Sequence, residues 1–201
     1  MMVKIVDNIS TLSEIIEELH GVYLDFTTNF YRHLDSSFNY NLKKLKIDDA
    51  LDSQEFMLML VKQYVDSLGN DETIGGKLLA VGMDYNFRYR IKQMDSLYRK
   101  MEHNLKKDRY VSKILNDFMG TRIILSNVNS QETEINELLG TLQQQGIISR
   151  FYHRDDKKYR ALHCYFQDTN RHFPWEFQIW DLEDSENNYK EHERHEKEKS
   201  E

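Results

Sequence analysis

The sequence predicts an α/β (α+β) domain in which a mixed sheet of about five strands is flanked by helices, with a helical extension at the N-terminus. Two patterns carry this prediction. In the first part of the chain, apolar residues recur at helical spacing. Beyond residue 85, short runs alternate apolar and polar residues, which is the period of a strand. A chain of 201 residues is long enough to bury one core.

The N-terminal residues are predicted to be mostly helical. Thr11 and Glu14 have the spacing of a capping box, and the apolar residues that follow indicate one long amphipathic helix over residues 11–35. A second helix is expected over residues 53–68. Residues 74–84 carry three glycines, and these favour a turn and a bend there.

The sheet is predicted from five β-prone stretches: residues 85–91, 117–125, 147–152, 159–166 and 175–180. Helices are expected between them and after them, over residues 94–106, 131–145 and 182–201. We therefore divide the chain into an N-terminal helical extension, a core and a charged C-terminal helix, with the ranges 1–80, 81–182 and 183–201.

Charge is unevenly distributed along the chain. The net charge of −7 argues against a general nucleic-acid binder. Residues 85–125 nevertheless contain ten Lys or Arg against four Asp or Glu, a surplus of six positive charges. A basic centre inside an acidic protein indicates a focused anion site rather than a broad electrostatic surface.

Cysteine content and hydropathy indicate the cellular compartment of the protein. Cys164 is the single cysteine, so the chain forms no internal disulfide, which is typical of a reducing cytoplasm. No apolar run is long enough to span a bilayer, and the first residues lack the apolar core and cleavage site of a signal peptide. We therefore expect a cytoplasmic protein with no membrane partner.

The stretch from Asp117 to Leu125 carries the strongest indication of chemistry. Asp117 stands just ahead of Gly120 and Arg122, and the apolar run that follows is typical of a buried strand. A rigid strand can aim both polar side chains at one ligand. Asp suits a cation and Arg suits phosphate oxygens, so the pair suits a metal-bound polyphosphate. By itself, the pattern fits equally well an Asp that caps a turn and an Arg in a surface ion pair.

Two other strands carry polar residues that a packed core does not require. In the first predicted strand, alternation puts Arg88, Arg90 and Lys92 on one face, as a row of positive charge. Such a row also suits a solvated edge strand. Glu176 lies within the last predicted strand, although Glu is a poor strand former. It either faces water or serves as a catalytic carboxylate.

Four stretches, taken in order, resemble motifs of the synthetase domain of the RelA/SpoT family, which transfers pyrophosphate from ATP to a nucleotide 3′-hydroxyl. They are the donor-binding run from Arg88 to Lys100, the metal-binding Asp117-x-x-Gly120-x-Arg122, the acceptor segment Tyr159-Arg160-Ala161-Leu162-His163, and the strand Glu176-Phe177-Gln178-Ile179. The resemblance covers residues 88–195, about half of the chain. No metal-dependent hydrolase motif precedes it, so the single-domain small alarmone synthetases are the closer comparison.

The resemblance implies roles for individual residues. The donor phosphates of ATP would be bound by Arg88, Lys92, Ser96, Arg99, Lys100 and Arg122. The acceptor would be contacted by Tyr159, Arg160, His163, Lys157, Lys158 and Gln178. Asp117 and Glu176 would hold Mg²⁺, and Glu176 would act as second ligand, general base or both. Tyr159, the third catalytic residue, would stack on the acceptor purine, where an aromatic face contributes roughly 1–3 kcal/mol per base.

Departures from the family pattern concentrate on the acceptor side. The segment between Tyr152 and Tyr159 lacks the Pro and Gly that shape the family's guanine pocket, and Trp180 replaces an Arg. Residues 150–160 carry five Lys or Arg against two Asp. A minority of small synthetases are toxins that pyrophosphorylate the 3′ end of tRNA and are neutralised by an antitoxin. We therefore favour tRNA as acceptor, with an antitoxin as a further partner and a homo-oligomer as a compatible state. Synthesis of (p)ppGpp-type nucleotides from GDP or GTP, or of adenosine analogues, is the alternative.

Two interpretations from other classes stay open. A catalytically dead nucleotide-binding module would keep the cations, but the intact Asp117 and Glu176 oppose it. A structural interaction protein built on the N-terminal helices is opposed by the four ordered motifs. In the tail, His192 or His195 would match the histidine of the family's last helix, and the neighbouring acids indicate a solvated helix face rather than a metal site.

Overall fold

The computed structural model describes residues 8–35, 38–81, 86–156 and 158–198. Its helical elements are α1 (Asn8–Arg32), α2 (Ile47–Asp52), the π-helix η1 (Glu55–Lys62), α3 (Gln63–Asn70), α4 (Glu72–Val81), α5 (Met94–Glu102), α6 (Val111–Ile114), the 3₁₀ turn η2 (Asn129–Gln131), α7 (Glu132–Gln144) and α8 (Ser185–Glu198). Its strands are β1 (Asn86–Ile91), β2 (Met119–Leu125), β3 (Arg150–Asp155), β4 (Arg160–Phe166) and β5 (Trp175–Asp181).

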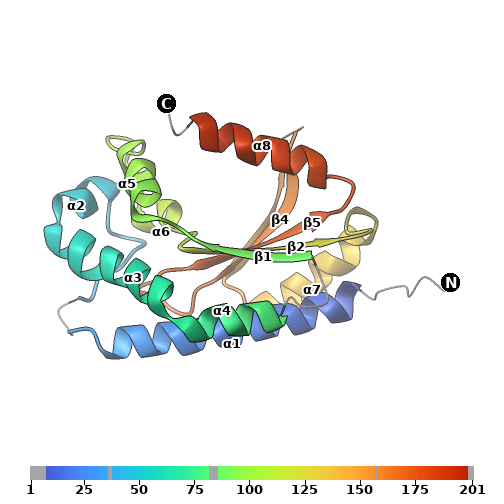
Figure 1. The fold of residues 1–201 in the computed structure, drawn as a ribbon, viewed down its shortest axis with the longest axis horizontal. Coiled ribbons are helices and arrows are strands. Elements are labelled where there is room, and N and C mark those ends of the chain that lie inside the picture. The colour runs from blue at the N-terminus through green and yellow to red at the C-terminus, as the bar shows by residue number, and fades with distance from the viewer. Residues whose placement is uncertain (1–7, 36–37, 82–85, 157, 199–201) are drawn as a thin grey trace.

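The five strands form one mixed sheet in the order β1-β2-β5-β4-β3. The β2 and β5 strands run parallel, and every other neighbouring pair is antiparallel. Helices α1, α4 and α7 lie against one side of this sheet, whereas α8 crosses the other side (Figure 1). The predicted fold class, a mixed five-stranded sheet flanked by helices, is confirmed.

The core fills the side of the sheet that α1 covers. Alternation along β5 sends Trp175, Phe177 and Ile179 to this side, where all three are buried. The Trp175 indole packs edge-on against the Tyr23 ring of α1, 5.5 Å between centroids, and its Nε1–H donates to Tyr64 Oη at 2.9 Å. Each fully buried apolar side chain of this size contributes roughly 1.5–3 kcal/mol. The same alternation leaves the opposite side of β5 free to carry polar groups.

The long N-terminal helix is confirmed, but its predicted start is wrong. Helix α1 already includes Asn8, the first described residue, so Thr11 is a buried helical residue and not a cap. The amide of Asn8 donates to the Ser126 backbone oxygen at 2.8 Å, which fixes this end of the helix beside the end of β2. The predicted helix over residues 53–68 is present as η1 followed by α3.

The prediction of a turn and a bend over residues 74–84 is wrong for the residues that the structure describes. They continue α4, because Ile74 and Leu78, one turn apart, are buried in the core and outweigh the low helix propensity of glycine. A Cβ added at Gly75 would stand 3.1 Å from the Tyr89 hydroxyl of β1. The glycine therefore serves close packing of the helix on the strand. Residues 82–84 lie outside the described residues.

Two further predicted boundaries are corrected. The helix predicted over residues 94–106 ends at Glu102, and the turn after it places Lys106 and Asp108 in the left-handed region, with φ of 59° and 53°. The strand predicted over residues 147–152 begins three residues later, because Gly146 ends α7 at φ 78° and the chain turns before it pairs with β4. None of the described helices is both long and apolar enough to cross a bilayer.

Candidate functional site

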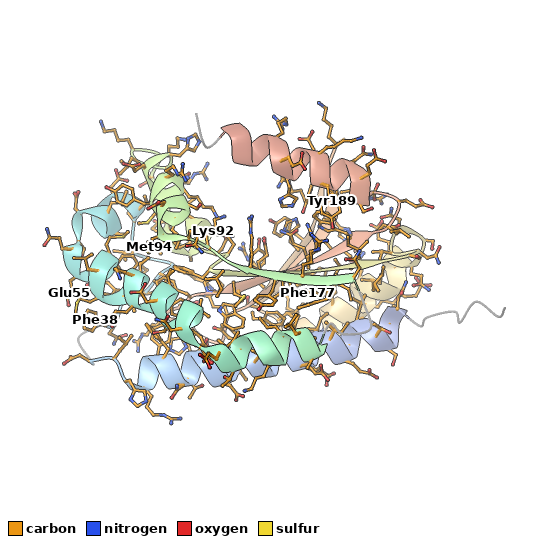
Figure 2. The ribbon with its side chains drawn as sticks, in the orientation of Figure 1. Phe38, Glu55, Lys92, Met94, Phe177 and Tyr189 are labelled. Carbon is orange, nitrogen blue, oxygen red and sulfur yellow. The ribbon has the colours of Figure 1, made fainter. Side chains whose placement is uncertain are left out.

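The polar side of the sheet carries a cleft of about 340 Å³ between the strands and α8. This size is at the lower end of the range for small-molecule sites. Tyr189 of α8 lies on this side of the sheet, and Phe177 lies on the core side (Figure 2). The cleft is lined by residues of β1, β2, β5 and α8 together with one residue ahead of β2: Arg88, Tyr89, Arg90, Asp117, Gly120, Thr121, Arg122, Glu176, Gln178, Tyr189, His192 and Glu193.

One end of the cleft is built around Asp117. Its carboxylate accepts from Lys92 Nζ at 2.8 Å and from Lys100 Nζ at 2.9 Å, so each oxygen faces one ammonium group. The side chain of Lys92 is 10% exposed and that of Asp117 is 15% exposed. Burial alone raises the pKa of Asp117, but the two lysines outweigh it, and the pKa lies well below its usual range. Lys100 also donates to Asn116 Oδ1 at 3.0 Å.

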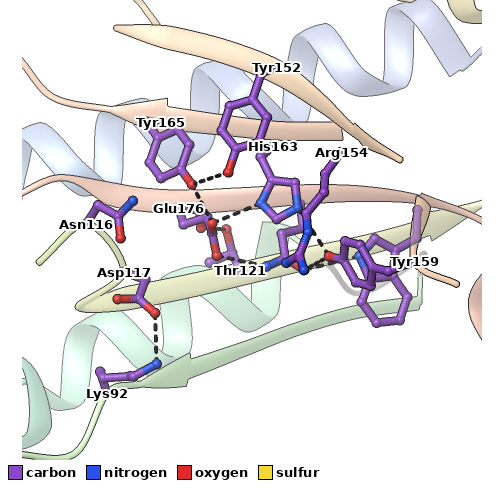
Figure 3. A network of polar contacts seen from close by, with 12 residues as sticks. Lys92, Asn116, Asp117, Thr121, Tyr152, Arg154, Tyr159, His163, Tyr165 and Glu176 are labelled. Atoms are coloured by element: carbon purple, nitrogen blue, oxygen red, sulfur yellow. Dashed lines mark hydrogen bonds and ion pairs between the residues drawn. The ribbon is translucent and has the colours of Figure 1, made fainter. Parts of the chain in front are cut away.

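Glu176 forms the second carboxylate centre, and its two oxygens contact three side chains. Its Oε1 accepts from Tyr165 Oη at 2.7 Å and lies 2.9 Å from His163 Nδ1, while its Oε2 accepts from Gln178 Nε2 at 2.8 Å. Figure 3 shows His163 and Tyr165 converging on this carboxylate, with Tyr152 behind them. Burial raises the pKa of Glu176, but His163 and the other donors lower it below its usual value. Glu176 is therefore ionised at neutral pH.

Strand register explains why these groups meet. Glu176 stands opposite Gly120 on β2 and opposite Tyr165 on β4. Because Gly120 has no side chain, it leaves space beside the Glu176 carboxylate. In the next row, Arg122 stands opposite Arg88 on one side and Gln178 on the other. The cleft thus runs from positively charged strands at one edge to the Glu176 network at the centre of the sheet.

Arg122 is held by aromatic rings of β5 and α8. Its guanidinium carbon lies 4.1 Å from the Trp180 ring centroid and 4.7 Å from that of Tyr189. One guanidinium nitrogen also donates to Tyr189 Oη at 3.3 Å. Cation–π contacts contribute about 0.5–1 kcal/mol at exposed sites and about 2 kcal/mol or more when they are desolvated. The arginine is therefore fixed in the cleft, and α8 depends on it for part of its docking.

Tyr159 lies deeper than a free stacking surface would. It is 4% exposed, and the Arg154 guanidinium carbon lies 4.7 Å from its ring centroid. Its hydroxyl donates to Gln178 Oε1 at 3.1 Å and lies 3.2 Å from His163 Nε2. Stacking on an acceptor base stays a prediction, and it requires Arg154 to move aside. In the structure Tyr159 supports the Glu176 network.

The structure does not gather all of the predicted residues at the cleft. Ser96 lies one turn before Lys100 on α5, near the Asp117 end, whereas the exposed Arg99 donates to the Asp95 backbone oxygen. Arg160 donates to Glu132 at 3.0 Å, and Lys158 is exposed outside the cleft lining. Lys157 lies outside the described residues.

Three residues that line the cleft or contact Glu176 were not predicted as site residues. Arg90 lines the cleft beside Gly120, closer to Asp117 than Arg88 is along β1. Tyr165 shares a strand face with His163, and that two-residue spacing was the signal that could have identified it. Tyr189 belongs to the charged tail, three residues before His192, where the resemblance indicates a histidine but no pattern indicates a tyrosine.

Asp117 and Glu176 fit a magnesium site of the kind that is completed by substrate. Both are carboxylates that line one cleft, and Mg²⁺ prefers oxygen ligands and commonly takes one or two carboxylates together with phosphate oxygens. No group of three or more His, Cys, Asp or Glu side chains in the described part of the chain could hold a metal by itself. The donor set therefore suits a metal ion that arrives with a polyphosphate.

Comparison with known proteins places the chain in a family. Residues 89–201, more than half of the chain, match the family model described as a region found in RelA/SpoT proteins. The chain belongs to the RelA/SpoT family. It is accordingly an ATP-dependent pyrophosphotransferase of the RelA/SpoT type. No curated protein matches the sequence.

Solved structures with a related arrangement include a GTP pyrophosphokinase family protein from Streptococcus pneumoniae. It is 19% identical, with 72% of this chain and 78% of that chain covered and a TM-score of 0.45. Small alarmone synthetase 1 from Bacillus subtilis is 18% identical over 70% of this chain and 78% of its own, with a TM-score of 0.41. Small alarmone synthetase 2 from the same organism is 20% identical, with coverages of 65% and 77% and a TM-score of 0.36.

Proposed function

We propose that this enzyme transfers the β,γ-pyrophosphate of ATP to the 3′-hydroxyl at the end of tRNA and thereby blocks translation. The donor half of the proposal rests on the cleft, where two ionised carboxylates lie among cations from three elements. Pyrophosphoryl transfer requires that the polyphosphate charge be neutralised and that the hydroxyl be held in line with it. In this proposal Lys92, Lys100 and Arg122 bind the phosphates.

In the proposed reaction both carboxylates would hold Mg²⁺, and Glu176 has the additional task of a general base. Glu176 accepts the proton of the acceptor 3′-hydroxyl, whose oxygen then attacks the β-phosphorus of ATP. The bond between the α-phosphate and the β-phosphate breaks, AMP leaves, and the pyrophosphoryl group ends on the 3′-oxygen. Asp117 and Glu176 would hold Mg²⁺, which supplies charge neutralisation to the polyphosphate when bound. The three donors around Glu176 keep its oxygens in one orientation.

The acceptor half rests on a basic surface outside the cleft lining. Residues 42–46 and 106–113 are joined by the bridge between Lys46 and Tyr110 and by a hydrogen bond from Val111 N to Leu45 O at 2.9 Å. Together they expose the residues that we call the basic surface: Lys43, Lys44, Lys106, Lys107 and Arg109. This surface begins just after α5, the helix that carries Lys100. Phosphates of a tRNA acceptor stem could reach it while the 3′ end occupies the cleft.

Transfer of label from ATP tests this proposal directly. The protein is incubated with γ-labelled ATP, Mg²⁺ and one acceptor, which is bulk tRNA, GDP or GTP. We expect label in tRNA, and loss of that transfer when the tRNA 3′-hydroxyl has been oxidised. Conversion of GDP or GTP to a 3′-pyrophosphate with no label in tRNA would contradict the tRNA assignment. Label in no acceptor would favour a nucleotide-binding module.

A second acceptor class is favoured by one specific observation. In the region that joins β3 and β4, Arg154 pairs with Asp156 at 2.8 Å, and Arg160 pairs with Glu132 at 3.0 Å. These pairs reduce the positive charge available to tRNA phosphates on that side of the cleft. A small acceptor such as GDP or GTP would not depend on such charge, so synthesis of an alarmone-type nucleotide is the second candidate.

A further inference from the structure

Each carboxylate oxygen of Asp117 contacts the ammonium group of a lysine. Lys92 approaches Oδ2 at 2.8 Å and Lys100 approaches Oδ1 at 2.9 Å. Lys92 directly follows β1, whereas Lys100 belongs to helix α5. All three side chains are largely buried, with 10%, 27% and 15% of Lys92, Lys100 and Asp117 exposed. Two ammonium groups face the two oxygens of Asp117, so the positive charges in contact with this carboxylate outnumber its own negative charge. A divalent cation that arrives alone is repelled by this excess of positive charge.

The geometry points to Lys92 and Lys100 as placeholders that occupy the metal-binding carboxylate until ATP arrives. We infer that the lysines leave Asp117 for the phosphates of ATP, and that the oxygens they release then become available to Mg²⁺. This inference rests on the proposed donor site. It makes metal binding depend on the nucleotide, because the triphosphate brings the negative charge that the cation needs and removes the cations that block it.

A purely phosphate-binding role for the lysines leads to a different expectation. If Lys100 served only to bind phosphate, its removal would weaken nucleotide binding and leave the affinity of the free protein for metal unchanged. If it is a placeholder, its removal frees Oδ1 of Asp117 and lowers the positive charge nearby. The two affinities then change in opposite directions, with metal binding stronger and nucleotide binding weaker.

The test measures metal binding without any reaction. Mn²⁺, which shares the preference of Mg²⁺ for oxygen ligands, is titrated into the nucleotide-free protein, and free Mn²⁺ is followed by electron paramagnetic resonance. We expect Lys100→Met to bind Mn²⁺ at least about tenfold more tightly than wild type, a difference of about 1.4 kcal/mol. The affinity of the same variant for α,β-methylene-ATP should fall. This analogue cannot transfer its pyrophosphate, because a carbon bridges the phosphates to be separated.

Three further variants separate the placeholder role from other effects. Lys100→Arg keeps the positive charge and should leave Mn²⁺ binding weak. Asp117→Asn combined with Lys100→Met should lose the gain, because the gain needs the carboxylate. Lys62→Met removes an exposed lysine that pairs with Asp66 on η1 and α3, away from the cleft, and should behave as wild type. Circular dichroism establishes that each variant is folded.

Two results would overturn the inference. The first is Mn²⁺ binding by nucleotide-free wild type that is as tight as that of Lys100→Met. The second is a gain that persists in the double variant, because the metal would then bind elsewhere. Failure of the proposed tRNA activity is a separate result, since it would appear as absent label transfer while the Mn²⁺ titrations remained unchanged.

Discussion

The two carboxylates of the cleft are buried to nearly the same degree, with 15% of the Asp117 side chain and 13% of the Glu176 side chain exposed, yet they are held in different ways. Asp117 is held by two lysine ammonium groups on flexible side chains. Glu176 is held by a tyrosine and a histidine of β4 and by a glutamine of its own strand, β5. Ammonium partners can exchange one anion for another, whereas donors fixed on a sheet keep one geometry. We therefore expect partners to be exchanged at the Asp117 end of the cleft and one orientation to be kept at the Glu176 end.

The largest effect is expected on turnover when Glu176, the carboxylate with the fixed orientation, is replaced. Glu176→Gln keeps the shape and one acceptor oxygen but removes the base, so turnover should fall by at least about 100-fold, the lower limit for a positioned acid–base group. Affinity for ATP should change far less. Single-turnover transfer from labelled ATP measures the first quantity, and titration with α,β-methylene-ATP measures the second. Near-normal turnover would show that Glu176 is not the general base and that its fixed orientation does not serve catalysis.

At the exchange end, a stability effect is expected as well as a loss of turnover. Asp117→Asn leaves two largely buried lysines without their counter-charge, and breaking such a pair costs roughly 2–3 kcal/mol after allowance for its partial exposure. Glu176→Gln introduces no unpaired charge, so it should cost clearly less. Urea unfolding of both variants beside wild type measures the difference. Equal costs would show that the two ends do not differ in the way proposed.

Much of the fold could be predicted because its signals are local. Each strand alternates within a few residues, and each long helix repeats its apolar positions. Helix α4 was missed because Gly75 and Gly76 are poor helix formers, and only packing against Tyr89 shows why a glycine is placed there. That contact joins residues from different elements, so no pattern within residues 74–84 reveals it.

The candidate site was predicted in part for the same reason. Asp117 and Glu176 could be found because a carboxylate in or beside an apolar strand is unusual. Their partners depend on strand register and helix docking: Tyr165 reaches Glu176 because β4 and β5 pair in one particular register. Lys100 reaches Asp117 only because α5 docks beside Asn116. Such pairings arise between distant segments, and periodicity does not determine them.

A moderate effect is expected on the basic surface, which lies outside the cleft. Replacing Lys43 and Lys44 by Glu should lower tRNA affinity by about tenfold at low salt, because each lost phosphate contact removes a share of counterion release. The salt dependence of binding should become shallower, and the affinity for α,β-methylene-ATP should not change. The double variant of Lys62→Glu and Lys77→Glu, at two exposed lysines of η1 and α4, changes the net charge by the same amount and serves as the control. Equal loss in that control would point to net charge rather than to a surface.

The smallest effect concerns the Tyr165 hydroxyl and its dependence on pH. Burial, together with the Glu176 charge, raises the pKa of Tyr165, so the hydroxyl stays protonated and donates at 2.7 Å to Glu176. This bond favours the charged carboxylate and contributes to the lowered pKa of Glu176. A carboxyl group whose pKa is lower in the folded state stabilises the protein above its unfolded pKa, and that stability is lost as pH falls through the folded value.

Tyr165→Phe removes this donor, so the pKa of Glu176 in the folded protein should rise. At pH 7 the variant should be less stable than wild type by about 1 kcal/mol, the typical net contribution of one intramolecular hydrogen bond. The difference should shrink as pH falls through the raised folded pKa of Glu176 in the variant, because the variant then takes up a proton that wild type still excludes, and it should level off below the lower folded pKa of wild type. Tyr152→Phe removes only the longer 3.3 Å contact to Tyr165 and should show a smaller version of the same trend. A stability difference that is constant from pH 7 to pH 3.5 would assign the loss to packing and not to the carboxylate.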